Sequence, residues 1–571
     1  MRFFDRSGFV LLGHFFRGLF ESELFSIRDR LVTIFAVILS LLAAFGLVLP
    51  LLFNHKYHVL NALHTASLYQ EAALADKLMF ICISFVITIL VTALQWHSLF
   101  PSPQDFLILC PLPLHRFQIF CAKFIALLLF ITLLNIGVNI FPAVMMPGVM
   151  SGQWQQPQGS LLHMSSLFLA CCFGGFFAFF ALVALQALFM NLLPSRWFAS
   201  FSLTLQVILL LFSLAALPLL LWLPDLHGYM HTQWQGAFRL PPLWFLGWEE
   251  EMLGLANPFA RALASQAKLS LSIAIACSLL LYALAYARNT SQLFTASTRR
   301  NSSWHSLASN LLNRGVRSTH ELAVISFTIK TLFRSRLHKM LLSAIFGLSL
   351  SLSFDSFSSL WIAHLVSHKT IHHSSLENAV LSTPLVISFF LLCGLRFIFL
   401  LPVESRSNWT FRLNEIYSDE FVVNATGKAL LLLGAVPVSL MAFVGFSFWL
   451  GVAGALTRTV FVFLMCLVLS EALLWNWDRV PFACPYLPGK HNLIQSLLLY
   501  GVALSFFAYV ATIIEMFALA SPTRTVLLFL GLLVAFYFMR LQRRRIGNHG
   551  ILLKFDDLPE PEVQTLQLEP D

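Results

Sequence analysis

Charged residues are scarce in this sequence. Only 11% of the 571 residues are Asp, Glu, Lys or Arg, whereas 58% are hydrophobic, and the mean hydropathy is +0.78. A typical soluble domain has about 25% charged residues. The composition therefore excludes an ordinary water-soluble globule.

Motifs for nucleotide binding and metal-dependent proteolysis are also missing. A P-loop requires G-x-x-x-x-G-K-[ST], but Gly427–Lys428 and Gly489–Lys490 have neither the upstream glycine nor the following hydroxyl residue. H-E-x-x-H is absent. The nine cysteines show no C-x-x-C spacing, which favours packing residues over a disulfide framework. We therefore assign no catalytic residue, metal or cofactor to the chain itself.

Long apolar runs dominate instead, and about 20 such residues cross a bilayer. Twelve windows qualify: 31–53, 78–98, 124–146, 161–190, 201–223, 269–287, 340–360, 379–400, 429–450, 459–476, 493–516 and 523–540. The least regular is 340–360, where serines and Asp355 interrupt the apolar run. We expect an all-α, polytopic transmembrane protein with about 12 spans.

The distribution of basic residues predicts the orientation, because cytoplasmic loops collect Lys and Arg. With the N-terminus inside and the spans alternating, most of the 36 Lys and Arg fall in cytoplasmic segments. The segments outside would hold Lys56, Lys77, Arg239, Arg261, Lys268, Lys369, Arg458 and Arg524. We expect both termini in the cytoplasm. The net charge of +9 then faces anionic lipid headgroups, with no nucleic-acid partner.

The two halves of the chain have similar layouts. Each opens with a basic, Phe-containing amphipathic stretch, at 14–30 and at 321–339, followed by two spans and a polar segment that ends in a lysine. Residues 106–132 and 411–437 superpose without a gap at an offset of 305, which places Lys123 on Lys428. Six spans per half keep the orientation, so we expect two parallel six-helix repeats.

The predicted organisation has five parts. They are an interfacial helix at 1–30, a first transmembrane half at 31–287, a basic linker with a second interfacial helix at 288–339, a second transmembrane half at 340–540 and a cytoplasmic tail at 541–571. An alternative for 1–30 is a basic tail. The first half also contains a Trp-rich outside segment, 224–268, that suits a re-entrant or interfacial hairpin. The corresponding turn of the second half, around 518–524, is short.

The cytoplasmic segment between the second and third spans, 101–123, reads PSPQDFLILCPLPLHRFQIFCAK. Its prolines break it into a short amphipathic helix joined to the third span. Such a helix could transmit force from a soluble partner; the alternative is an ordinary interfacial turn.

Together, the interfacial helix, the two spans, the D-F-L-x-x-x-P-L-P-x-x-R segment and the aromatic hairpin resemble the ABC-2 type permeases of bacterial ABC exporters. The resemblance implies that residues 105–123 dock into a separate ATPase subunit, present in two copies, which binds ATP and Mg. The outside hairpin of the family maps to Pro241–Leu263. The second half matches in layout but lacks the P-L-P element and the long hairpin. The residues at the centre of the implied coupling helix are Asp105, Pro111, Leu112, Pro113, His115 and Arg116.

Acidic residues near the bilayer are costly and often functional. Glu249 and Glu250 lie beside Trp244 and Trp248, where they either shape a substrate exit or cap the hairpin at the water surface, and the spacing favours the cap. Glu471 and Glu515, in predicted spans, are candidates for a polar pathway or a proton relay.

His364, His368 and His372 recur every four residues, with His373 adjacent. On a helix three of them would share one face, as zinc ligands do. Glu377 is the one further ligand nearby, so we favour a wet interfacial segment and predict no metal site.

The sequence thus predicts a transport subunit, itself not an enzyme, in the bacterial cytoplasmic membrane. It would export a lipophilic or amphiphilic substrate, driven by its ATPase partner. One alternative is an ion- or proton-coupled secondary transporter, which requires ionisable residues paired within the membrane. Another is an intramembrane lipid-modifying enzyme or metalloprotease, which requires a His/Asp/Glu cluster near one membrane face.

Overall fold

The computed structural model describes most of the helical regions of the chain. The described residues are 6–19, 44, 46–62, 66–96, 99, 109, 116–151, 159–221, 238–289, 318–367, 373–401, 419–475, 477, 479–482 and 493–547. They form helices and turns, and no β-strand occurs among them. The predicted all-α fold is confirmed.

Ten of the helices that these residues form are long and apolar enough to cross a bilayer. They are Ala66–Leu94, Gln118–Val149, Ser160–Leu192, Pro258–Ala285, Arg336–Phe354, Asn378–Leu400, Phe421–Phe448, Gly451–Leu473, Leu499–Leu519 and Pro522–Arg545. Each overlaps one predicted window. The window 201–223 falls in α8 (Ser195–Leu221), with a shorter apolar stretch at Phe201–Leu217. The window 31–53 lies mostly outside the described residues. The chain is a polytopic helical membrane protein; twelve spans and the orientation of the termini stay predictions.

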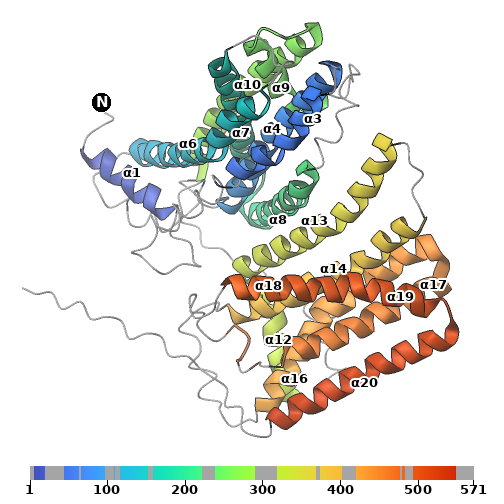
Figure 1. Ribbon diagram of the computed structural model, residues 1–571. Helices are drawn as coiled ribbons and strands as arrows, with labels where there is room; N and C mark the ends of the chain where they lie inside the picture. Colours follow the sequence, from blue (N-terminus) through green and yellow to red (C-terminus); the bar gives the residue numbers. More distant parts are fainter. Residues whose placement is uncertain are drawn as a thin grey trace, which may run out of the picture. The chain divides into compact units, whose positions relative to one another are not determined.

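The chain divides into two compact units (Figure 1). Unit 1 comprises 1–299 with 358–370, and unit 2 comprises 300–357 with 371–571. The division at 299/300 falls inside the segment 288–339 that the sequence marks as a linker. Each unit has its own hydrophobic core, one centred on Met79, Phe179 and Phe245 and the other on Leu392, Phe399 and Phe461.

Unit 1 is built around three helices that pack closely. Its elements are α1 (Arg6–Gly18), α3 (Asn54–Ala62), α4 (Ala66–Leu94), α6 (Arg116–Val149), α7 (Ser160–Leu192), α8, α9 (Pro241–Met252) and α10 (Pro258–Asn289). Gly174 and Gly175 of α7 face the Phe85 ring of α4 and the Asn135 amide of α6, and a Cβ at either glycine would overlap them. Small residues thus allow α7 to approach both neighbours.

In unit 2, two of the spans meet at a sharp kink at Gly451. Its elements are α12 (Thr319–Arg334), the first part of α13 (Arg336–Ser367), α14 (His373–Leu400), α16 (Asp419–Leu430), α17 (Val436–Leu473), α18 (Leu493–Leu504), α19 (Ala511–Leu519) and α20 (Pro522–Gly547). π-Helical turns, Leu431–Ala435 and Ser505–Val510, connect α16 to α17 and α18 to α19. Within α17 the backbone breaks at Gly451, whose φ of 74° is readily adopted only by glycine. The two spans that meet there are joined by almost no loop.

The same packing recurs in both units. In unit 1, α1 lies against α6, beside which it appears in Figure 1, and Lys123 Nζ is 4.8 Å from the centroid of the Phe15 ring. In unit 2, α12 lies against α16, and Lys428 forms an ion pair with Glu321. Lys123 and Lys428 are the lysines that the 305-residue offset superposes. The two contacts match at these positions, and the parallel six-helix repeat stays a prediction.

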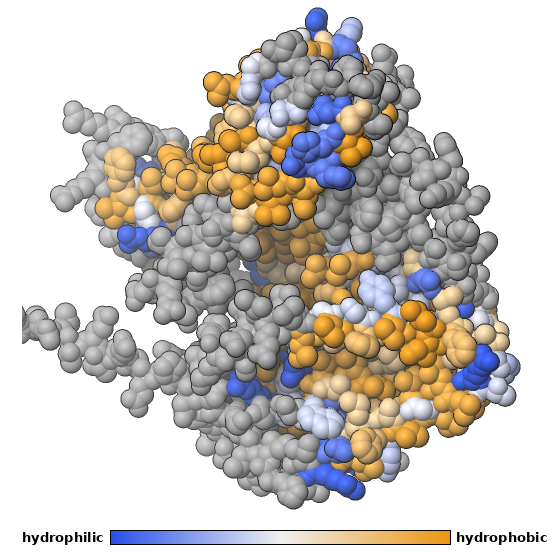
Figure 2. Space-filling model, in the orientation of Figure 1, coloured by the Kyte–Doolittle hydropathy of each residue, from blue (hydrophilic) through white to orange (hydrophobic). Residues whose placement is uncertain are grey.

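The surface of unit 2 is apolar over the middle of its helices, and Figure 2 shows hydrophilic residues toward the ends. On α20, Leu527 is 68% exposed and Val534 66% exposed, and no residue of the most apolar part of this span is buried. Soluble monomers rarely expose such continuous apolar surface, so these side chains have the lipid phase as their solvent.

Candidate functional site: buried charges beside the aromatic hairpin

The segment Pro241–Leu263, here called the aromatic hairpin, consists of α9, a tight turn and the beginning of α10. Pro241 and Pro242 start α9, where missing N–H groups are tolerated, and Gly254 in the turn has a φ of 75°. Gly247 faces α10, and a Cβ there would lie 2.7 Å from the Ala260 carbonyl oxygen. The two arms are therefore in direct backbone contact.

Aromatic side chains hold the hairpin against α4 and α7. Phe245 is fully buried, with its ring centroid 5.5 Å from that of Phe85. Trp248 stacks on Phe173 at 4.6 Å and 14°, and the Trp244 ring lies 5.9 Å from that of Phe177. Trp244 and Trp248, which the sequence places beside the glutamates of a possible substrate path, thus both pack on the body of unit 1.

Glu249 projects from α9 into the interior of unit 1, where none of it is exposed. Its two carboxylate oxygens lie 2.8 and 3.0 Å from Lys77 Nζ of α4, and Ser166 of α7 donates a hydrogen bond of 3.4 Å. The favoured interpretation of a cap at the water surface is therefore wrong for Glu249. The aromatic side chains of α9 pack on α4 and α7, and this packing turns the face of α9 that holds Glu249 toward the interior of unit 1.

Lys77 itself lies within a membrane-spanning helix and not in a loop. The helix α4 begins at Ala66, twelve residues before the predicted span 78–98. The hydropathy window excluded Glu71, Asp76 and Lys77 because they are charged, yet all three are buried. A charge that finds a partner inside the protein is compatible with a span.

Asp76, the neighbour of Lys77, holds α3 in place. It is fully buried and accepts hydrogen bonds from Lys56 Nζ at 2.8 Å and from the Tyr57 hydroxyl at 2.7 Å. Burial, and then the negative charge of Asp76, raise the pKa of the Tyr57 hydroxyl well above its usual value. Two successive residues of α4 therefore bind α3 and α9. Sequence reasoning missed both partners, although an Asp-Lys pair at the edge of an apolar run is a visible signal.

The other glutamates of α9 lie closer to water. Glu250 is partly exposed; burial, and then the charge of Glu249, raise its pKa to about 7, against the opposing effect of Lys77. Glu251 forms an ion pair of 2.6 Å with Lys268 of α10, and these side chains are 36% and 48% exposed.

The two glutamates predicted in unit 2 each face an arginine. Glu515 of α19 is fully buried, with Oε1 3.6 Å from an Arg458 guanidinium nitrogen of α17. Glu471 of α17 accepts a 2.7 Å hydrogen bond from Arg543 Nε of α20. Arginine does not give up its proton in proteins. The ion pairs therefore favour a structural role for Glu471 and Glu515, in which they hold neighbouring helices together, over the predicted proton relay.

At the opposite end of α4, side chains from other helices bind carbonyl groups of its last turn and of the residues just after it. Gln186 of α7 donates to the Trp96 carbonyl at 2.9 Å, and Gln206 of α8 donates to the Ala93 carbonyl at 2.7 Å. The Tyr282 hydroxyl of α10 donates to the Leu99 carbonyl at 2.5 Å. Unit 2 has a related contact, since His338 Nε2 lies 3.1 Å from the carbonyl oxygen of Leu401, which the 305-residue offset places on Trp96.

Several predicted residues lie outside the part of the chain that the structure describes. These are the coupling residues Asp105, Pro111, Leu112, Pro113 and His115, and the side chains of Arg116, His364, His368, His372, His373 and Glu377. Arg116 is the first residue of α6. Among the described residues, no group of three or more His, Cys, Asp or Glu is placed to hold a metal ion.

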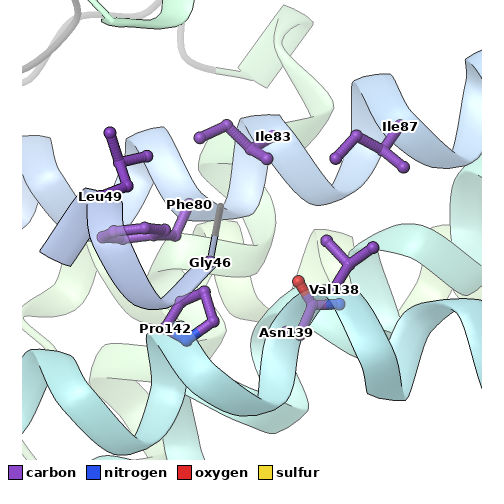
Figure 3. Close-up of a pocket in the computed structure, with 8 residues that line it drawn as sticks. All are labelled: Gly46, Leu49, Phe80, Ile83, Ile87, Val138, Asn139 and Pro142. Carbon is purple, nitrogen blue, oxygen red and sulfur yellow. The ribbon is translucent and has the colours of Figure 1, made fainter. Parts of the chain in front are cut away.

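A small pocket lies between the helical residues 46–49, α4 and α6 (Figure 3). It is lined by Gly46, Leu49, Phe80, Ile83, Ile87, Val138, Asn139 and Pro142. Asn139 supplies its polar group and donates a 2.9 Å hydrogen bond to Ser84 Oγ. The volume of about 10 Å³ is close to the minimum for one water molecule, too small for a transported amphiphile.

Comparison with models of protein families, with curated protein sequences and with solved structures finds no match for this chain.

Proposed function

We propose that the chain is the membrane-spanning subunit of an ATP-driven exporter of the ABC-2 type, with both transmembrane halves in one polypeptide. ATP would be hydrolysed by a separate ATPase subunit, in two copies, at the cytoplasmic face of a bacterial inner membrane. One observation carries the proposal. In each unit an amphipathic helix packs on the helix that begins the third predicted span of that half: α1 packs on α6, and α12 packs on α16.

The contacts around the predicted coupling segment support this function. A segment that receives force from a partner must be joined firmly to the membrane helices on both sides. Before it, Gln186, Gln206 and Tyr282 bind carbonyl groups at the end of α4 and in the residues just after it. Within it, Leu109 and Ile119 pack with Leu11 and Phe15 of α1.

The apolar surfaces of the helices support the proposed substrate class. Most of the large apolar side chains that the described helices expose are Leu, Phe, Val and Ile, and ion pairs occupy several of the buried charges. A lipophilic or amphiphilic substrate suits such surroundings better than a free ion or a sugar.

Affinity purification of the tagged chain from its native membrane in mild detergent tests the proposal. We expect a nucleotide-binding subunit to copurify and to hydrolyse ATP, and Pro113→Asp to abolish its recovery. Leu162→Asp, at an exposed site on α7, is the matched control and should retain the partner. Purification of the chain without any ATPase, across several detergents, would contradict the proposal.

The buried ion pair Lys77–Glu249 favours proton-coupled secondary transport as the second candidate, because a lysine and a glutamate can exchange protons where an arginine cannot. The two candidates differ in their energy source. Transport in vesicles that stops with a protonophore and continues without ATP would identify the second; ATP dependence that survives the protonophore supports the first.

A further inference from the structure

We propose that Lys77 and Glu249 form a latch that fastens the aromatic hairpin to α4 and connects its opening to the opposite end of that helix. The inference deepens the proposed function and rests on it for the role of the hairpin in export. The latch itself is a property of the isolated chain.

The Lys77–Glu249 ion pair differs from the other contacts of the hairpin in its burial. Glu249 is fully buried, and the Lys77 side chain is 11% exposed. The Lys268–Glu251 pair on the same hairpin is far more exposed, and exposed pairs contribute little. The aromatic contacts of Trp244 and Trp248 leave no unpaired charge when they separate, whereas separation of the ion pair does.

The helix α4 is suited to transmit movement. Lys77 and Leu94 are 17 residues apart, which corresponds to about 26 Å along an α-helix, most of the thickness of a bilayer core. Asp76 binds α3 beside the latch, and Gln206 of α8 binds the Ala93 carbonyl at the far end. A shift of the segment after α4 therefore reaches Lys77 through one continuous helix.

Because the two charges are buried together, the hairpin has two states, closed and open, with no stable intermediate. A buried carboxylate and ammonium are tolerated together, whereas either one alone is strongly unfavourable. The hairpin is therefore either closed, with the pair formed, or open, with both charges in water. Gly247, in backbone contact with α10, lets α9 and the beginning of α10 move as one body.

Hydrogen–deuterium exchange of the purified full-length chain tests the latch. Lys77→Met leaves Glu249 without its cation, and we expect the amides of 241–252 to exchange about 100-fold faster. Lys268→Met is the matched control, because it removes the exposed lysine of the same hairpin, and it should change exchange less than about 3-fold. Unchanged protection in Lys77→Met would overturn the proposal.

A double-mutant cycle separates the ion pair from general loosening. We expect Lys77→Met combined with Glu249→Gln to exchange no faster than Lys77→Met alone, because both changes break one interaction. Additive effects would refute a shared latch. If Lys77→Met also loosens peptides of α6, Glu249→Gln alone decides: faster exchange limited to 241–252 supports the latch, and wild-type exchange refutes it.

The outcomes distinguish the latch from the proposed function. If the exchange result holds and no ATPase copurifies, the latch stands and the export proposal fails. If an ATPase copurifies and its activity is unaffected by Lys77→Met, while exchange is also unaffected, only the latch fails.

Discussion

Three consecutive residues of one type, Glu249, Glu250 and Glu251, have three different surroundings. Successive helical residues point about 100° apart, so one carboxylate is buried against Lys77, one lies at the margin, and one meets Lys268 in water. The three residues are adjacent in the sequence, so their local sequence context does not explain the difference. The difference arises from the face of α9 that the aromatic rings beneath it turn inward.

Glu250 gives the hairpin a dependence on pH. Its pKa of about 7 in the folded protein lies above the ordinary value of 4.5, so its protonated form is favoured by folding. This stabilisation is complete below about pH 4.5 and is lost as the pH rises to about 7. We expect the unfolding free energy to fall by about 1–2 kcal/mol across that interval, since water still reaches the side chain.

Thermal unfolding in detergent at pH 5 and pH 8 measures this effect. Glu250→Gln should reduce the difference between the two temperatures, and Glu251→Gln should leave it unchanged. An equal difference in wild type and Glu250→Gln would show that another group is responsible.

The buried and exposed ion pairs of unit 2 should differ in strength. Glu471→Gln leaves Arg543, whose side chain is 7% exposed, without its counter-charge, and we expect a loss of about 3 kcal/mol. Glu321→Gln breaks a pair in which Lys428 is 43% exposed, with an expected loss of under about 1 kcal/mol. Urea unfolding in mixed micelles compares the two. Similar losses would mean that burial does not set the strength of these pairs.

The sequence identified the glutamates of the site but not their partners. Glu249, Glu471 and Glu515 stand out because acidic residues near a membrane are costly. Trp244 and Trp248 stand out because tryptophan gathers at membrane interfaces. Lys77 was assigned to a loop because a hydropathy window treats each charge as the end of a span. Which charges pair depends on contacts between α4 and α9, 172 residues apart, and no local pattern contains that information.

At the scale of the helices, α1 depends on one buried face. Phe15 is 2% exposed, packs with Leu11 and Ile119, and contacts Lys123, whereas Phe9 on the same helix is 57% exposed. We expect Phe15→Ala to release α1 from α6, with a local loss of about 3 kcal/mol. Phe9→Ala should have little effect.

Limited proteolysis measures the release of α1. Cleavage within 6–19 should be accelerated in Phe15→Ala and not in Phe9→Ala. Equal cleavage in the two variants would show that α1 is held in the bilayer by lipid alone.

Helix positions were largely predictable because a span is a local property of about 20 residues. The predicted windows 161–190 and 379–400 agree with the spans Ser160–Leu192 and Asn378–Leu400 to within two residues. The start of α4 was not predictable, since its first turns contain charges whose partners lie elsewhere. The π-helical turns Leu431–Ala435 and Ser505–Val510 leave no mark in a hydropathy profile.

For the whole molecule, the separate cores of the two units predict separate folding. A site-specific protease sequence inserted between Arg299 and Arg300 should allow cleavage without loss of either core. We expect the far-ultraviolet circular dichroism to be unchanged and each fragment to resist further digestion. Collapse of one fragment into small peptides after the cut would mean that its core depends on the other unit.

The reversal at Gly451 has a consequence for biosynthesis. Because Phe421–Phe448 and Gly451–Leu473 are joined by almost no loop, almost no connecting chain separates the insertion of the first span from that of the second. We therefore expect the two spans to enter the lipid together, as a pair. Insertion of a glycan acceptor or an epitope at this turn would therefore interrupt assembly and not merely decorate the surface.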